Sequence, residues 1–243
     1  MPRPAWIALL AAAAFAVILL TRLPASWVIP RTGSIACASA DGSVWSGSCS
    51  GLRVERMAFG DLAWDAVPLR LLTGTLAAHV VLANGPVTGS ADVAYGFGGS
   101  IQLRSLVVQL PLDPRRIPRV PSMLRGSLHT DLSLVRIEHG ALAELKGRIE
   151  AHDLTQRTGR VTPIGSYAVT FPGGGIEPVG KLEDLGGPLA VQGTLRLTRE
   201  GGYVLEGEVA PRAGAAPELV SDLQFLGSPD ALGRRPFSIA GTL

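Results

Sequence analysis

Residues 175–181 have the spacing of a phosphate-binding loop as far as Lys181. Leu182 follows where such a loop needs a serine or threonine hydroxyl that binds Mg²⁺. Pro178 also removes a backbone amide, and Glu177 brings a negative charge toward the phosphate position. We therefore interpret this match as coincidental and predict no nucleotide site.

Residues 47–51, Gly-Ser-Cys-Ser-Gly, have the outline of a nucleophile elbow with Cys49 in the central position. Such an elbow needs a strand before the nucleophile and a helix after it, and no helical pattern follows here. A disulfide with Cys37 is the simpler interpretation. Two buried free thiols are the alternative.

His129 with Asp131, and His152 with Asp153, have the residue types of acid–base pairs. On a strand, His129 and Asp131 share one face, and the alternation of apolar residues predicts that this face lies in solvent. The sequence has no Cys-x-x-Cys or His-Glu-x-x-His motif, and its four histidines are scattered. We predict no catalytic residue, no metal site and no cofactor, and hence a protein that is not an enzyme.

Residues 5–20 form an apolar run without a charged or amide side chain. Extended to residue 23, the run approaches the roughly 20 residues that cross a bilayer. Arg3 precedes it, which favours a cytoplasmic N-terminus. A cleaved signal peptide is the alternative, but no Ala-x-Ala site lies at the proper distance. We expect an anchor over residues 1–23 and an exported domain over residues 24–243.

The net charge of +2 comes from the N-terminal part of the chain. Arg3, Arg22 and Arg31 are the charged residues of positions 1–40, so the remaining chain carries a net charge of −1. A nearly neutral domain lacks the basic surface that nucleic acid requires. Outside the cytoplasm disulfides persist, and a Cys37–Cys49 bond would stabilise the fold by about 3 kcal/mol.

Short segments of alternating polarity predict half-buried strands. The clearest is 127–134, in which Leu128, Thr130, Leu132 and Leu134 share one face. The others are 75–82, 166–171, 194–198 and 203–209. Asn84-Gly85 and residues 200–202 are hairpin signals. We also expect strands to begin just after Gly74, Gly126, Gly147, Gly193 and Gly202.

Helical signals are weaker. Residues 216–226 have apolar residues at helical spacing, with Pro217 suited to the first turn and Gly227 to the end. Residues 113–121 contain three prolines and predict an extended linker between two groups of strands. The expected fold is mainly β: the anchor, then a long antiparallel sheet, curved or folded over, with one or two short helices.

Several segments together resemble the type II secretion system protein N family. Residues 23–28 follow the anchor, and residues 42–47 are similar to the family's Gly-x-x-Trp-x-Gly signature. The likeness covers essentially the whole chain, and its most specific part is the C-terminal third. The remaining similar segments are 62–64, 68–74, 163–167, 182–189, 193–197, 202–205, 210–212 and 227–235.

The resemblance implies a single-pass inner-membrane protein with a β-rich periplasmic domain and no known catalysis. It implies a role in exporting folded proteins across the outer membrane, with other secretion components as partners. Within the similar segments, Trp45 is expected to be a core residue or an interaction residue. The turn at Gly186, Gly187 and Pro188 is expected to fix strand register. The other structural or interaction candidates are Trp64, Gly42 and Gly47.

Lipid binding and periplasmic hydrolysis are the two alternative functions. Periplasmic proteins of the AsmA type share the N-terminal anchor and the β-rich body, and a curved sheet with an apolar face could hold lipid in a trough. Contact with membrane lipid and a lipid ligand are therefore further expectations. A periplasmic hydrolase is disfavoured, because no catalytic constellation is present.

Overall fold

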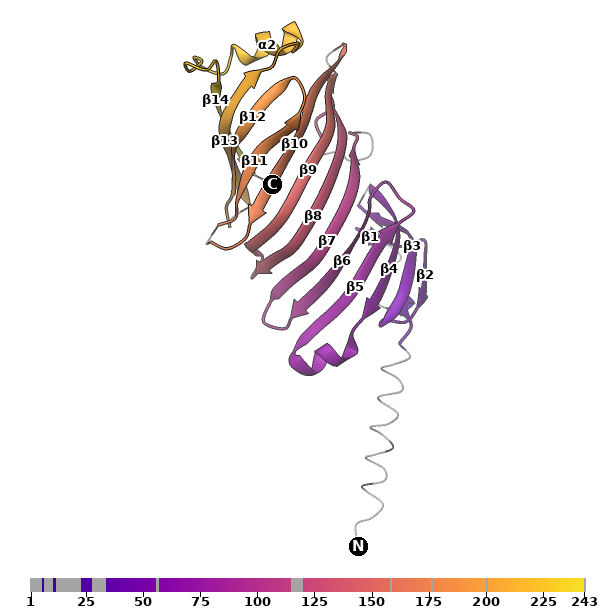
Figure 1. Ribbon diagram of the computed structural model, residues 1–243. Coiled ribbons are helices and arrows are strands. Elements are labelled where there is room, and N and C mark those ends of the chain that lie inside the picture. The colour runs from indigo at the N-terminus through magenta and orange to yellow at the C-terminus, as the bar shows by residue number, and fades with distance from the viewer. Residues whose placement is uncertain are drawn as a thin grey trace.

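The alternating segments of the sequence form strands of one curved antiparallel sheet (Figure 1). In it, β1 and then every strand from β3 to β14 follow one another in chain order, and β2 pairs with β3. The predicted strands lie within β5, β8, β10, β12 and β13, except that Thr198 follows the end of β12, and they confirm the mainly β, antiparallel fold class. The computed structural model describes residues 6, 11, 23–27, 34–55, 57–114, 120–157, 159–175, 177–199 and 201–242.

The described residues form fourteen strands, most of them 8–17 residues long. Their bounds are β1 (Ile35–Ala36), β2 (Ser39–Gly42), β3 (Ser46–Val54), β4 (Met57–Ala66), β5 (Thr75–Ala83), β6 (Thr88–Gly96), β7 (Ser100–Leu112), β8 (Leu124–Glu138), β9 (Ala141–Arg157), β10 (Val161–Pro172), β11 (Val179–Gly186), β12 (Leu189–Leu197), β13 (Gly202–Pro211) and β14 (Arg235–Thr242).

The predicted anchor lies outside the described residues except for Trp6, Ala11 and Leu23. Among the residues that the structure describes, no helix is long and apolar enough to cross a membrane. The described short helices are η1 (Ala25–Trp27), η2 (Pro68–Thr73) and α2 (Pro217–Leu223).

The predicted C-terminal helix is present but shorter than expected. Pro217 occupies its first turn as predicted, yet α2 ends at Leu223 rather than at residue 226. The following amides bond to carbonyls three residues back, as when Leu226 donates to Leu223, so the chain continues as tight turns. Leu219 and Leu223 are buried, and Leu223 packs with Leu189 and Val209 of the sheet.

Segment 113–121 connects two neighbouring strands. β7 and β8 pair along their length, from Ser100 opposite Glu138 to Leu112 opposite Gly126. The strands on either side of this segment are therefore adjacent in one sheet. Residues 115–119 lie outside the described part of the chain.

The expectation that strands begin after Gly126, Gly147 and Gly193 is wrong, because all three lie inside strands. At Gly147, a Cβ atom would lie 2.3 Å from the carbonyl oxygen of Asp131. The β8–β9 register also shifts there, between Leu132 and Leu134. Glycine thus permits a bulge at which two backbones approach closely.

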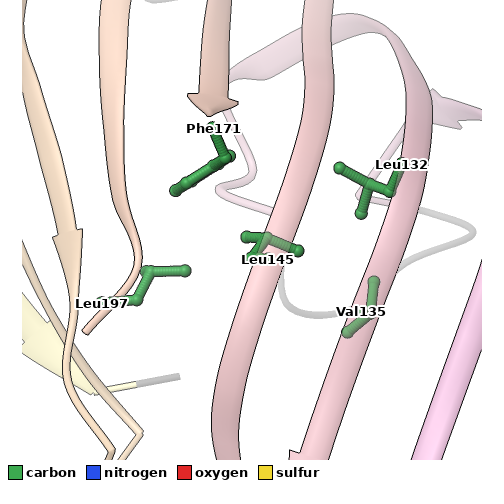
Figure 2. Packing of buried hydrophobic residues seen from close by; sticks show 5 residues of the cluster. All are labelled: Leu132, Val135, Leu145, Phe171 and Leu197. Atoms are coloured by element: carbon green, nitrogen blue, oxygen red, sulfur yellow. The ribbon is translucent and has the colours of Figure 1, made fainter. Parts of the chain in front are cut away.

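The bulge changes which side chains share a face. Leu132 and Val135, three positions apart, both join the main apolar cluster, whereas the sequence pattern put Leu134 on that face. Figure 2 shows this cluster between β8 and the more distant β12. Strands that are not neighbours meet there because the sheet curls, and the apolar face is therefore the concave one. The buried members are Leu132, Val135, Leu145, Phe171 and Leu197.

Candidate interaction surface

The residues with catalytic types are distributed over β3, β8, β9 and β11. Lys181 lies within β11, paired with Thr170 and Thr194, and its strand is not followed by a helix. Asp131 is exposed on the convex face of β8. His129 and His152 both line a shallow hollow of about 490 Å³, together with Leu110 and Leu128.

His152 belongs to a surface charge network. Its Nε2 lies 2.9 Å from a carboxylate oxygen of Glu150, and Arg148 Nε donates to the other oxygen at 2.6 Å. The hydrogen bond from Arg148 lowers the pKa of Glu150 most, and the bond with His152 lowers it as well, so this pKa lies below its usual value. Arg148 also donates to Glu183 on β11, so the network spans three strands. Within the described residues, no group of three or more His, Cys, Asp and Glu side chains could hold a metal ion.

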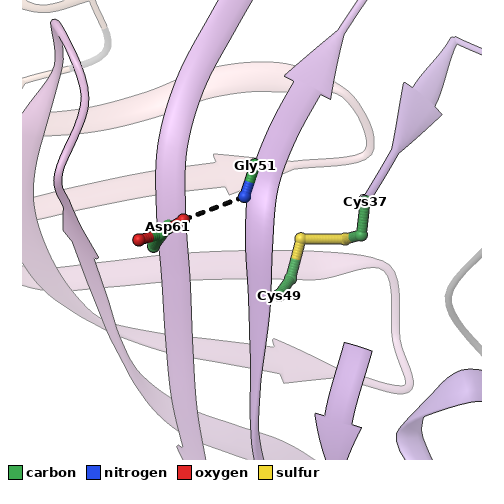
Figure 3. Close-up of a disulfide and its surroundings, with 4 residues drawn as sticks. All are labelled: Cys37, Cys49, Gly51 and Asp61. Atoms are coloured by element: carbon green, nitrogen blue, oxygen red, sulfur yellow. Dashed lines mark hydrogen bonds between the residues drawn. A yellow bond between two sulfur atoms is a disulfide. The ribbon is translucent and has the colours of Figure 1, made fainter. Parts of the chain in front are cut away.

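Cys37 and Cys49 are joined by a disulfide, with their Cα atoms 5.6 Å apart (Figure 3). Cys49 is fully buried in β3, so its sulfur is not available as a nucleophile. Asp61 of β4 accepts a hydrogen bond from the Gly51 amide at 2.9 Å and another from Asn84 at 3.0 Å. The hydrogen bond from the Gly51 amide lowers the pKa of Asp61 most, and the bond from Asn84 lowers it as well.

The Gly-x-x-Trp-x-Gly segment forms the turn between β2 and β3. Gly42 has φ +89° there, and the Ser43 hydroxyl accepts hydrogen bonds from the amides of Trp45 and Ser46. A Cβ atom on Gly47 would lie 2.6 Å from the ring of Trp64. The two glycines thus let the chain turn and let the indole lie against the strand.

Trp64 completes this arrangement from β4. Its indole Nε1 donates to the carbonyl of Val44 at 3.1 Å. Both Trp45 and Trp64 are half-buried rather than fully buried, so neither is a core residue in the strict sense. A single sheet has no second layer to cover its apolar face, which explains why these large rings remain partly accessible.

Trp45 and Trp64 line an apolar hollow of about 380 Å³ on the concave face. A second hollow, of about 210 Å³, shares Leu52, Leu62 and Val80 with the first and continues it to β7. The first hollow is lined by Ile35, Cys37, Val44, Trp45, Cys49, Leu52, Leu62, Trp64, Ala66, Leu76, Ala78 and Val80. Among the side chains of its lining, the Trp64 indole bonds to Val44 and the two cysteines are bonded to each other.

The predicted turn at Gly186, Gly187 and Pro188 links β11 to β12. Asp184 accepts hydrogen bonds from the amides of Gly186 and Val191, at 3.2 and 3.1 Å. Burial raises the pKa of Asp184. The hydrogen bond with Arg212 and the two amide bonds lower this pKa by more in total, so the net shift is downward.

Arg212 clamps the same turn from the end of β13. Its guanidinium lies 2.5 Å from Asp184 and donates to the carbonyls of Gly187 and Leu189. The sequence interpretation missed this ion pair, since the two residues are 28 positions apart. The only signal was that both lie in segments that resemble the same family.

The motif segments therefore meet in two places: the Trp45–Trp64 hollow and the Asp184–Arg212 clamp. The family model described as type II secretion system (T2SS), protein N matches residues 34–238, which include both places. The chain belongs to this family. The type II secretion system protein N of Vibrio cholerae serotype O1 is 25% identical over 257 residues, covering 94% of this chain and 96% of the relative. No solved structure matches the chain significantly.

Membership of the T2SS protein N family makes the chain a component of the secretion machinery and accounts for the order of its motifs. The family match begins at residue 34, just before β1, and ends within β14. It therefore coincides with the sheet. Of the residues whose types suggested chemistry, Cys49 forms a disulfide, His152 lies 2.9 Å from Glu150, Lys181 lies within β11 and Asp131 is exposed.

Proposed function

We propose that this protein is an anchored inner-membrane subunit of the type II secretion system. In this proposal it supports export of folded periplasmic proteins across the outer membrane by binding other components of the machine. The observation that carries the proposal is the family match over residues 34–238. The proposed role is binding rather than catalysis.

The proposed topology has residues 1–23 as the anchor, with a cytoplasmic N-terminus, and residues 24–243 in the periplasm. It is supported by the apolar run at 5–20, by Arg3 before it and by the Cys37–Cys49 disulfide, which suits an oxidising compartment. Alkaline phosphatase fused after Leu243 should be active and should sediment with membranes. Activity confined to a soluble product trimmed at its N-terminus would refute the anchor.

The secretion role is tested by deleting the gene and restoring it with the wild-type chain. The deletion should reduce the amount of cargo in the medium and leave it in the periplasm, and the wild-type chain should restore export. Co-purification from crosslinked membranes should recover other secretion components. Normal export in the deletion strain, under conditions in which the other components are expressed, would contradict the proposal.

A second function, lipid binding, is favoured by the two joined hollows. They extend from β3 to β7, four interstrand spacings or about 19 Å. One leaflet of a bilayer core is about 15 Å thick, so a lipid acyl chain has a comparable length. An extended peptide would leave its backbone polar groups unpaired against the apolar lining of the first hollow, whereas an acyl chain has none to satisfy.

Lipid binding is tested with a phospholipid that carries a photoreactive group on its acyl chain. In vesicles, the full chain should crosslink within β4 and β5 as well as within the anchor. Val80→Asp places a charge in the hollow and should reduce the β4–β5 crosslinks several-fold. Val81→Asp, on the opposite face of the same strand, is the matched control. Crosslinks confined to residues 1–23 would contradict lipid binding by the sheet.

A further inference from the structure

The connection between β4 and β5 carries apolar side chains that point into solvent. It contains η2, in which Leu69 is 76% and Leu72 is 85% exposed. The next turn at the same end of the sheet, between β6 and β7, carries Phe97 at 65% exposure. The two turns touch, because the Phe97 amide donates to the carbonyl of Gly74 at 3.1 Å.

The chain enters the sheet at this same end. The carbonyl of Leu23 accepts a hydrogen bond from the Val44 amide at 3.0 Å, and Pro24 forms a β-bridge with Ser43. The neighbouring end of β4 is tied to the same turn, since the Ala66 amide donates to the carbonyl of Trp45 at 2.5 Å. The first residue after the predicted anchor thus lies beside the strand that leads into η2. Figure 1 shows η2 at the lower end of the sheet and α2 at the upper end.

The apolar character of this end decreases with distance along the sheet from the anchor. Because the strands alternate in direction, the connections at 139–140, 173–178 and 198–201 lie at the same end as η2. Their described residues are histidine, glycine, glutamate, proline, threonine and arginine. Among the described residues of the connections at this end, the exposed large apolar side chains are therefore those of the two connections nearest to Leu23.

We propose that η2 and the β6–β7 turn form a membrane-contacting tip. In this proposal Leu69, Leu72 and Phe97 insert into the periplasmic leaflet of the inner membrane, which also holds the anchor. This inference rests on the anchored topology proposed above. An exposed apolar patch of this kind marks an interaction site, and amphipathic segments bury such side chains at the boundary between headgroups and acyl chains. Arg70, in the middle of η2, can remain among anionic headgroups.

The tip gives the domain a defined orientation. The anchor and the tip together attach the domain to the membrane at two points. In this orientation the N-terminal strands lie next to the bilayer, and the C-terminal strands extend away from it. The hollow lined by Trp45 and Trp64 then opens close to the membrane surface, and α2 faces away from the membrane. The occupant proposed for the tip is the lipid bilayer, and a second protein at this position is an alternative that the experiment separates.

The test uses the full chain reconstituted into vesicles of phosphatidylethanolamine and phosphatidylglycerol. The two cysteines of the sequence are bonded to each other, so a single added cysteine can be labelled with an environment-sensitive fluorophore. Leu72→Cys reports the tip. Leu232→Cys is the matched control, since Leu232 is also a leucine, is 75% exposed and lies between α2 and β14.

The Leu72→Cys label should be blue-shifted and quenched several-fold more strongly by spin-labelled lipids than the Leu232→Cys label. Aqueous iodide should quench the Leu232→Cys label preferentially. Equal iodide quenching of both labels would overturn the tip. A blue shift at Leu72→Cys that requires high protein density and is insensitive to spin-labelled lipid would indicate protein contact and overturn it as well.

The same experiment distinguishes the tip from the proposals on which it depends. Failure of the protein to float with vesicles would overturn the anchor and the tip together. Flotation without lipid quenching at Leu72→Cys would overturn only the tip. Because the vesicles contain no other secretion component, neither result depends on the secretion role, which the export assay tests separately.

Discussion

The ring of Trp64 lies directly against the backbone of Gly47 on the neighbouring strand, so a Cβ atom there would come 2.6 Å from the indole. The two residues are also paired in the β3–β4 register. The contact explains why the signature at residues 42–47 ends in glycine. It also links that signature to Trp64, which lies in a separate similar segment.

Gly47→Ala should destabilise the domain by about 1–3 kcal/mol, because the added methyl group displaces the Trp64 ring or the strand. The measurement is urea unfolding followed by tryptophan fluorescence. Gly98→Ala is the control, since a Cβ atom at Gly98 meets nothing within 4 Å. Equal unfolding midpoints for the two variants would contradict the proposed contact.

Replacing both Cys37 and Cys49 with alanine should lower the free energy of unfolding by about 3 kcal/mol, since the disulfide closes a short loop in the unfolded chain. Reduction of the wild-type protein should have a similar effect. Thiol alkylation of protein taken from cells, without reductant, should label neither cysteine. Labelling of both would show that the bond does not form in the cell.

Asp184→Asn should cost about 1–3 kcal/mol at neutral pH, because the carboxylate accepts bonds from Arg212 and two amides. The folded pKa of Asp184 is lowered, so its stabilisation is fully present above the unfolded pKa of about 3.9 and is lost as the pH falls through the lower folded value. The stabilities of wild type and variant should therefore converge below about pH 4.

The measurement is the free energy of unfolding as a function of pH. Asp131→Asn, at an exposed position on the convex face, is the control and should leave stability at neutral pH nearly unchanged. A constant difference between wild type and Asp184→Asn from pH 7 to pH 2 would contradict the role assigned to the ionised carboxylate.

Trp45→Ala should leave protein abundance nearly normal but reduce export. Its ring is half-buried on the hollow, so the loss of stability should be well below the roughly 3–5 kcal/mol of a fully buried tryptophan. Trp64→Ala should lower abundance, because it removes the hydrogen bond to Val44 and the ring that lies against Gly47. Immunoblots and export assays on the same cultures separate the two effects. A loss of Trp45→Ala protein as large as that of Trp64→Ala would make Trp45 a structural residue.

Single replacement of His129, Asp131 or Lys181 by alanine should leave export at the wild-type level. These residues lie within β8 and β11, and the proposed function is binding rather than catalysis. Export is compared at matched protein abundance. A variant that is folded and abundant but does not support export would identify a functional role for that side chain.

The strands and the fold class could be predicted because alternation is a local property. A period of two, as in residues 127–134, specifies an extended segment with one apolar face whatever that face contacts. Turn residues such as Asn84-Gly85 are equally local, and β5 does end at Ala83, just before them. The family resemblance similarly depends on the order of short motifs along the chain.

The bulges, the clamp and the hollow depend on contacts between distant residues. Gly147 lies inside a strand because two backbones approach there, and Arg212 reaches Asp184 only after β11, β12 and β13 have paired. The alternation showed that one face is apolar, but not whether another layer covers it. In the folded protein the main buried cluster lies on β8, β9, β10 and β12, whereas Trp45 and Trp64 are half-buried at the other end of the sheet. The physical reason is that a single curved sheet buries its apolar face where its own strands meet across the curve.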